Sequence, residues 1–339
     1  MKLIKTEDAV GHVLCHDLTQ IIKDQYKDAR FRKGHVVTQE DIPVLLSMGK
    51  EHLYVWEMTP GMLHENDAAE RLYALCVGDH MDRSEVKEGK IELKAACDGL
   101  FRVNSEKLMA VNSIEDIMIA TRKGGTAVRK GDKLAGMRVI PLIIPEEKLQ
   151  AAEQAAGDTP LLELKPWVRR TAAIVATGSE VKKGLIQDTF TPVVKDKLAF
   201  YGIETLSVSY SGDGVENVAN AIAEARATGA DVILCTGGMS VDPDDNTPGG
   251  IKESGAKIIT YGAPVLPGAM FLLGYYDDGT PVMGLPGCVM YAGATIFDLV
   301  LPFVAADVPV TRQQIVALGE GGLCLGCKPC HWPACPFGK

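Results

Sequence analysis

The chain has 339 residues, and 46% of them are hydrophobic, which is enough to fill the cores of two or three domains. Its formal net charge of −9 argues against nonspecific nucleic-acid binding, because that function needs a basic surface. No apolar run reaches membrane-spanning length, and the sequence opens without the apolar core of a signal peptide. These features favour a cytoplasmic protein that binds neither nucleic acid nor a membrane.

Residues 1–60 are predicted to form a small α/β unit. Thr38 and Asp41 are spaced as in a capping box, which predicts a helix that runs through Leu46. Gly49 is placed to end this helix, since glycine readily adopts the left-handed conformation of a helix terminus. A strand is expected over residues 52–56.

Residues 61–165 are predicted to form a helix, a β-rich domain and a linker. The helix begins near His64 and runs through Ala74, with apolar residues on one face. Turn signals such as Asp98-Gly99 divide the next stretch into short strands. The expected strands are 91–95, 117–120 and 138–144, and a charged helix at 145–156 with a loop at 157–166 is interpreted as the linker.

Strands and helices alternate through residues 166–318. The expected strands are 172–176, 205–210, 231–235 and 257–261, and the expected helices are 192–201 and 216–228. This alternation predicts a three-layer α/β domain with a mostly parallel sheet, preceded by a smaller α+β or β-rich region. A hairpin over 270–283 and an apolar helix over 290–305 follow, and residues 319–339 form a separate cysteine-rich tail.

The loop after the expected strand at 231–235 has the composition of a ligand site. An apolar strand, the pair Gly237-Gly238 and a helix start at Thr247-Pro248 are the layout of a site at the carboxyl edge of a parallel sheet. Glycine lets backbone amides approach an anion closely, and nearby acids suit a divalent metal that bridges to it. The acids of the loop are Asp242, Asp244 and Asp245. A polar turn with a helix cap is the alternative.

Residues 236–245 read TGG-x-S-V-x-x-x-D. This segment resembles the pterin-binding loop of the molybdenum-cofactor biosynthesis domain, which molybdopterin adenylyltransferases and molybdopterin molybdenumtransferases share. Four further segments agree with that family in the expected order. They are TGSE at Thr177–Glu180, the pair Asp188-Thr189, the acid Asp213, and GLPG at Gly284–Gly287. Five ordered matches make the resemblance a strong one at the level of the domain.

The resemblance implies a protein that binds molybdopterin or the molybdenum cofactor and handles pterin and molybdate insertion, with Mg²⁺ as a second cofactor and as a homo-oligomer. It gives catalytic roles to Asp245 and Asp188. The implied cofactor-binding residues are Thr177, Gly178, Ser179, Glu180, Thr189, Asp213, Gly237, Gly238, Ser240, Asp242, Thr247, Pro286, Gly287 and Cys288. Capping a helix is a sufficient structural explanation for Asp188 or Asp213 alone.

Two segments depart from the family. The chain reads Asp188-Thr189-Phe190 where molybdenumtransferases read D-S/T-N, and Cys288-Val289 where they read Asn-Pro. The missing Asn-Pro pair bears on turnover rather than on the fold. Two alternatives to an enzyme of metal insertion therefore stay open: a non-catalytic carrier that delivers finished cofactor to a molybdoenzyme, and a nucleotide pyrophosphatase of the competence-damage-inducible type.

The tail carries four closely spaced cysteines. Cys324, Cys327, Cys330 and Cys335 have the spacing C-x2-C-x2-C-x4-C-P, one residue longer than a bacterial ferredoxin run. Four thiolates can satisfy a tetrahedral metal, so an iron–sulfur cluster or Zn²⁺ is predicted here, with His331 as a spare ligand. An unliganded, flexible tail is the alternative. The other five cysteines lie in apolar contexts typical of reduced, buried thiols.

Overall fold

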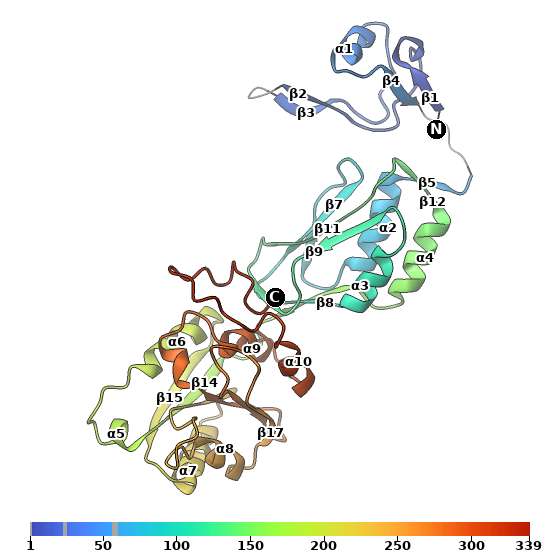
Figure 1. The fold of residues 1–339 in the computed structure, drawn as a ribbon. Coiled ribbons are helices and arrows are strands. Elements are labelled where there is room, and N and C mark those ends of the chain that lie inside the picture. Colours follow the sequence, from blue (N-terminus) through green and yellow to red (C-terminus); the bar gives the residue numbers. More distant parts are fainter. Residues whose placement is uncertain (1, 23–25, 56–59) are drawn as a thin grey trace. The chain divides into compact units, whose positions relative to one another are not determined.

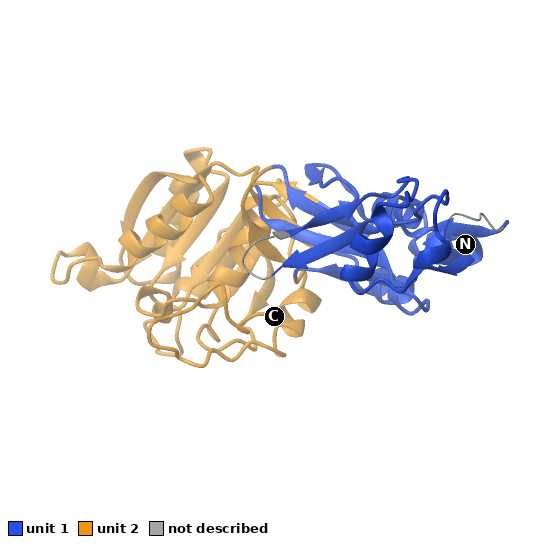
Figure 2. Cartoon of the chain, turned by 90° about the horizontal axis from the view of Figure 1, so that it is seen from above, with its two compact units in different colours: residues 1–96, 103–122, 131–163 blue, residues 97–102, 123–130, 164–339 orange. Residues whose placement is uncertain are grey.

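The computed structural model describes residues 2–22, 26–55 and 60–339 (Figure 1). The chain divides into two compact units, which Figure 2 shows in different colours. Unit 1 comprises residues 1–96, 103–122 and 131–163, and unit 2 comprises residues 97–102, 123–130 and 164–339. No helix in the described ranges is long and apolar enough to cross a membrane. The division of the chain at residues 60, 165 and 318 stays a prediction.

The first part of unit 1 contains two small antiparallel sheets and one short helix. Its elements are β1 (Lys2–Lys5), η1 (Thr6–Asp8), β2 (Leu18–Ile22), β3 (Tyr26–Phe31), α1 (Asp41–Ser47) and β4 (His52–Val55). The helix prediction is confirmed. The capping box is not, because the helix has no side-chain hydrogen bond at its N-cap; the Thr38 amide and hydroxyl instead both donate to Asp41 Oδ2, at 2.8 and 2.9 Å. The predicted strand is confirmed as β4 through Val55, and its last position, 56, lies outside the described residues.

The following stretch is richer in secondary structure than the sequence indicated. Its elements are β5 (Met62–His64), α2 (Glu65–Cys76), β6 (Met81–Arg83), β7 (Lys90–Ala95), β8 (Gly99–Val103), α3 (Ser105–Asn112), β9 (Ile117–Thr121), β10 (Thr126–Val128), β11 (Lys133–Val139), β12 (Ile143–Pro145), α4 (Glu146–Ala156) and β13 (Leu162–Pro166). Strands order as β6-β7-β11-β9 in one sheet and β10-β8-β13 in another.

Residues 145–166 are not a linker of helix and loop. In α4, Leu149 and Ala152 are fully buried, so the helix is part of a core in spite of its charges. The expected loop contains β13, which buries Leu162 and Leu164. The prediction was wrong because the surface charges of α4 concealed an apolar face with helical spacing. The single strand expected over 138–144 was also wrong, since β11 ends at Val139 and β12 is separate.

Unit 2 contains the predicted α/β sheet. Its elements from β14 onward are β14 (Thr171–Thr177), α5 (Ser179–Lys182), α6 (Phe190–Phe200), β15 (Glu204–Ser211), α7 (Val215–Ala227), β16 (Val232–Thr236), α8 (Thr247–Glu253), β17 (Lys257–Tyr261), β18 (Leu272–Tyr275), β19 (Pro281–Leu285), η2 (Gly287–Met290), α9 (Ile296–Ala305) and α10 (Arg312–Ala317). The strand order is β15-β14-β16-β19-β18-β17. Pairing is parallel from β15 to β19 and antiparallel at β18, which confirms a mostly parallel sheet.

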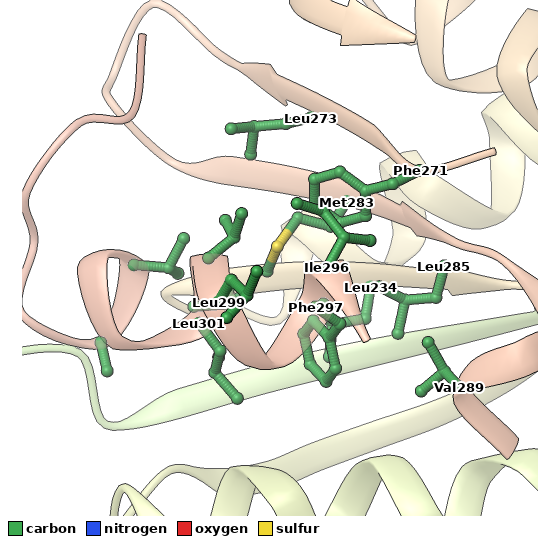
Figure 3. Close-up of a cluster of buried hydrophobic side chains, with 14 of the residues drawn as sticks. Leu234, Phe271, Leu273, Met283, Leu285, Val289, Ile296, Phe297, Leu299 and Leu301 are labelled. Atoms are coloured by element: carbon green, nitrogen blue, oxygen red, sulfur yellow. The ribbon is translucent and has the colours of Figure 1, made fainter. Parts of the chain in front are cut away.

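Helices cover both faces of this sheet, as the three-layer prediction requires. On one face, Val194 of α6 and Phe297 of α9 pack into a large core, part of which Figure 3 shows. On the other face, Ile222 of α7 and Ile251 of α8 pack into a second core. Phe297 is fully buried, and its burial contributes about 1.5–3 kcal/mol to the free energy of unfolding.

The last long helix begins later than predicted. Residues 287–290 form the 3₁₀ turn η2, and α9 starts at Ile296 rather than at residue 290. Thr295 and Asp298 form a capping box at this start, with the Thr295 amide donating to Asp298 Oδ2 at 2.8 Å. The apolar run from residue 290 concealed the break, because a periodic pattern does not show where a cap interrupts it.

The cysteine-rich segment is folded against unit 2. Phe337 is only 2% exposed and belongs to the core that α9 lines. The Gly338 amide donates to the Gly321 carbonyl at 2.9 Å, so the two ends of the segment meet. A Cβ atom on Gly338 would lie 2.3 Å from Leu299 Cδ2, which shows how closely the backbone packs on α9. The alternative of a flexible tail is therefore wrong for the chain as folded here.

Gly250 lets α8 pack closely on α7. A Cβ atom at Gly250 would lie 2.5 Å from Val218 Cβ, which is too close for any L residue without a shift of the helices. We expect Gly250→Ala to lower the free energy of unfolding by about 1–3 kcal/mol. Gly249→Ala is the matched control, since its Cβ would meet the Val215 side chain, with Cγ2 nearest at 2.9 Å, and no atom as close as Val218 Cβ is to Gly250. Equal urea midpoints for the two variants would contradict this packing.

Candidate functional site

Three of the predicted segments follow neighbouring parallel strands. Thr177 ends β14, Thr236 ends β16 and Leu285 ends β19. Ala176 pairs with Thr236, and Thr236 pairs with Leu285, so the segments that follow start at one edge of the sheet. The chain goes from β14 to β15 on one side and continues with β16 on the other. The edge between β14 and β16 is therefore a topological switch point, where α/β sheets bind ligands.

The glycine pair lets the loop after β16 pack against the end of β14. Gly237 and Gly238 have φ of +85° and +55°, a region that L side chains rarely adopt. A Cβ atom at Gly237 would lie 2.4 Å from the Thr177 carbonyl oxygen. One at Gly238 would lie 2.8 Å from Thr247 Oγ1. Both positions therefore require glycine, and the loop backbone lies directly against the end of β14.

Two buried threonines join the same elements. Thr177 Oγ1 lies 2.8 Å from Thr247 Oγ1 and donates to the Thr236 carbonyl at 3.0 Å. Thr247 is 1% exposed, and its amide donates to the Gly238 carbonyl at 3.1 Å. The sequence predicted both threonines as cofactor-binding. The structure places their hydroxyls in contact with each other, where they fix the start of α8 against β14.

The TGSE segment is tied to the predicted acid Asp213. The Ser179 amide donates to Asp213 Oδ1 at 3.3 Å, and the Asp213 amide donates to Ser179 Oγ at 3.4 Å. The Gly178 amide donates to the Ser211 carbonyl at 3.1 Å, which continues the register of β14 and β15 beyond Thr177. Glu180 and Asp213 are both exposed at this edge.

Asp188 has two carboxylate oxygens in different situations. Its Oδ1 atom accepts from the amides of Phe190 and Thr191 at 3.0 and 2.9 Å, so it caps α6. Its Oδ2 atom is buried and has no hydrogen-bond partner in the described chain, and the same is true of Thr191 Oγ1. Buried polar atoms normally have partners, so these two acceptors indicate a place for a ligand or water. Capping alone therefore does not account for Asp188.

The loop at residues 239–246 contains Asp245, which the sequence predicted to be catalytic. The Asp245 amide donates to the Asp242 carbonyl at 2.9 Å, which folds the loop into a turn. Asp245 is half-buried, whereas Ser240, Asp242 and Asp244 are exposed. The structure therefore separates Asp245 from the solvated acids beside it.

Tyr261 of β17 holds this loop, a role that the sequence did not indicate. Its hydroxyl donates to the carbonyls of Met239 and Ser240 at 3.1 and 3.4 Å. Burial and the negative charge of Asp245 raise the pKa of Tyr261, so the phenol stays protonated and able to donate. Tyr261 ends β17, which lies three strands from β16 in the sheet, so local sequence spacing gave no signal for this contact.

The GLPG segment completes the edge. A Cβ atom at Gly284 would lie 2.5 Å from Met239 Sδ, so glycine lets the loop rest on β19. Pro286 is buried, while Gly287 is exposed and presents its backbone. Cys288 is half-buried, and burial, followed by the charge of Asp298, raises the pKa of its thiol. Thr189 reaches this segment through Met290, with 3.1 Å between Oγ1 and Sδ.

The described residues contain no group of three or more His, Cys, Asp or Glu side chains that could hold a metal ion. Mg²⁺ is commonly held by one or two carboxylates with phosphate and water as its other ligands, and the half-buried Asp245 is a carboxylate beside the glycine loop. The four tail cysteines are among the described residues, and they form no such group; Cys324 and Cys335 are half-buried, and Cys327 and Cys330 are exposed. The iron–sulfur or zinc site stays a prediction.

Two parts of the chain match known families. Residues 3–57 match a domain of unknown function (DUF8806), and residues 173–306 match the probable molybdopterin binding domain. The second match begins within β14, extends past β19 and includes every predicted site residue outside the tail. Residues 173–306 belong to the molybdopterin-binding domain family.

Curated relatives match only part of this chain. A CinA-like protein from Desulfosudis oleivorans is 37% identical over 86 residues, which are 25% of this chain and 21% of that protein. A protein named as competence-damage inducible from Oceanobacillus iheyensis is 35% identical over 82 residues, 24% of this chain and 19% of that protein. The chain thus spans about a fifth of the length of these relatives.

Solved structures of molybdenum-cofactor proteins also match. The molybdopterin biosynthesis Mog protein from Mycobacterium ulcerans has 21% sequence identity and a TM-score of 0.34, and the match covers 40% of this chain and 94% of that one. The molybdopterin biosynthesis enzyme MoaB from Thermus thermophilus has 20% identity and a TM-score of 0.32, and its match covers 40% of this chain and 91% of that one.

Removal of the Tyr261 hydroxyl should loosen the loop. We expect Tyr261→Phe to raise amide hydrogen exchange over residues 239–246, because each lost hydrogen bond contributes about 0.5–1.5 kcal/mol. Tyr210→Phe is the matched control, since Tyr210 is 45% exposed, against 44% for Tyr261, and lies on the opposite edge strand β15. Exchange over 239–246 that is equal in the two variants would show that the tyrosine does not hold the loop.

Proposed function

We propose that unit 2 binds molybdopterin at the carboxyl edge of β14, β16 and β19 and handles molybdate insertion. The observation that carries the proposal is the meeting, at one edge, of five segments that resemble those of the molybdopterin-binding family. Residues 173–306 match that family, and the edge is a topological switch point. The assignment of individual residues to roles, and assembly as a homo-oligomer, are part of the proposal.

The chemistry of the site suits a pterin that carries an anionic group. At Gly287 the space that a Cβ atom would fill is open, so its backbone can approach an anion closely, whereas Gly237 and Gly238 let the loop backbone pack against Thr177 and Thr247. The unpartnered Asp188 Oδ2 atom offers a buried acceptor to the N–H groups of a heterocycle. Burial without a partner costs the free protein stability, and a donating ligand would remove that cost.

Asp245 is proposed as the carboxylate that acts at the reacting anions. It is held on a turned loop whose backbone Tyr261 binds. When bound, Mg²⁺ would lower the repulsion between molybdate and the pterin-bound anion. Asp245 would supply one oxygen to that ion, and the glycine loop would fix the position of its anionic partner.

The chain departs from the family at a place that favours the carrier alternative. Val289 is fully buried in the core that α9 lines, where the family reads proline. The raised pKa of Cys288 keeps its thiol protonated and less nucleophilic. A carrier for a molybdoenzyme would bind the pterin but release no AMP and insert no molybdate, so turnover assays separate it from an enzyme.

A nucleotide pyrophosphatase is the second candidate function. This candidate is favoured by the names of the curated relatives, which are described as CinA-like and as competence-damage inducible. Hydrolysis of ADP-ribose by the purified chain, without binding of molybdopterin, would support this candidate over the first.

Asp245→Asn should weaken molybdopterin-dependent molybdate insertion and leave folding unchanged. Loss of an interaction with a charged group costs about 1.5–3 kcal/mol, which is roughly a ten- to hundredfold loss of rate or affinity. Asp244→Asn, an exposed acid of the same loop, is the matched control and should behave like the wild type. Molybdopterin titration by fluorescence and molybdenum content measure the effect. Wild-type behaviour of Asp245→Asn would make Asp245 a structural acid, and no pterin binding by the wild type would refute the function.

A further inference from the structure

The cysteine-rich segment forms a closed loop that is fixed to unit 2 on two sides. We call residues 321–338 the cysteine loop. At its base, the Leu266 amide donates to the Gly322 carbonyl at 2.8 Å, and the Cys324 amide donates to the Leu266 carbonyl at 2.8 Å. At its other end, the buried Phe337 ring meets Trp332 edge-on, with 5.7 Å between ring centroids. These contacts leave the middle of the loop as an exposed tip.

The fold divides the four cysteines into two pairs. Cys324 and Cys335 are half-buried and pack against the core of unit 2. Cys327 and Cys330 are exposed at the tip, and the chain bends between them at Lys328 and Pro329. A tetrahedral metal site needs all four thiolates at one point, and the described residues contain no group of three or more such side chains that could hold a metal ion. The observed arrangement instead isolates a C-x2-C pair.

Cys330 is seated on the chain segment that follows η2. A Cβ atom on Gly293 would lie 2.6 Å from Cys330 Sγ and 3.0 Å from Cys330 Cβ. The sulfur is therefore covered on one side by the Gly293 backbone, although the residue as a whole is exposed. Because this backbone covers the Cys330 sulfur on one side, we expect Cys327 to react first and Cys330 second.

The charge of the loop differs from that of the whole chain. Residues 321–338 contain Lys328 and His331 and no acid, whereas the chain carries a net charge of −9. Lys328 lies between the two exposed thiols in sequence. An anionic reaction partner is therefore attracted to this tip and repelled by the chain as a whole.

We propose that Cys327 and Cys330 form a dithiol site that exchanges with anionic low-molecular-weight disulfides. The Cys327 thiolate attacks one sulfur of the small disulfide, forms a mixed disulfide and releases the first small thiolate. The Cys330 thiolate then attacks the Cys327 sulfur, forms the Cys327–Cys330 disulfide and releases the second small thiolate. The chain loses two electrons and two protons, and the small disulfide is reduced to two thiols. This site is independent of the proposed pterin function.

Glutathione redox buffers applied to the full-length protein without oxygen test the proposal. Free thiols are trapped by alkylation and located by mass spectrometry after digestion. We expect Cys327 and Cys330 to leave the alkylated pool together, as one intramolecular disulfide, while Cys324 and Cys335 stay alkylatable once the protein is denatured. Two separately glutathionylated cysteines without a disulfide would overturn the proposal. So would stoichiometric iron or zinc that protects all four thiols.

Three variants sharpen the test. Cys330→Ser should accumulate the mixed disulfide on Cys327, whereas Cys327→Ser should lose the fast reaction with glutathione disulfide. Gly293→Ala should move Cys330 and change the rate of the second step, with the first step unchanged. Cys97→Ser, at a half-buried thiol of unit 2 outside the loop, is the control and should react like the wild type. Disulfide formation at an unchanged rate in Cys327→Ser would exclude this pair.

Discussion

The close approach of β14 and β16 at their carboxyl ends is the constraint on which the site depends. The backbone at Gly237 lies so near the Thr177 carbonyl oxygen that a Cβ atom would be 2.4 Å away. The buried Thr177–Thr247 hydroxyl pair then holds the start of α8 against the same strand. Because the strand ends and the helix start are fixed together, the loop between them is anchored at both ends. Its acids are positioned by these anchors and by Tyr261, which binds two of its carbonyls.

Burial separates residues that look alike in the sequence. Asp242, Asp244 and Asp245 are neighbours, yet only Asp245 is half-buried. Asp188 uses one oxygen to cap α6 and leaves the other buried without a partner. A free protein gains no stability from such an atom, so it supports a ligand-binding role for Asp188. The exposed acids satisfy their charges in water and need no such explanation.

The sequence predicted the sheet of unit 2 well because alternation and glycine carry direct physical information. The strands β14, β15, β16 and β17 and the glycine loop are close to their predicted ranges. Where it failed, the deciding contacts were long-range: β13 pairs with β8, and α4 buries an apolar face beneath its charges. The Tyr261 contact and the division of the tail cysteines also depend on which distant segments meet, and local spacing does not specify this.

The footprint of molybdopterin on the full-length chain tests the central claim most directly. Amide hydrogen exchange is measured with and without the pterin under anaerobic conditions. We expect the pterin to slow amide exchange over residues 177–180, 188–191, 237–247 and 284–290, and to leave the exchange of unit 1 and the cysteine loop unchanged. Binding that protects a different surface, and leaves the edge of β14, β16 and β19 unprotected, would contradict it.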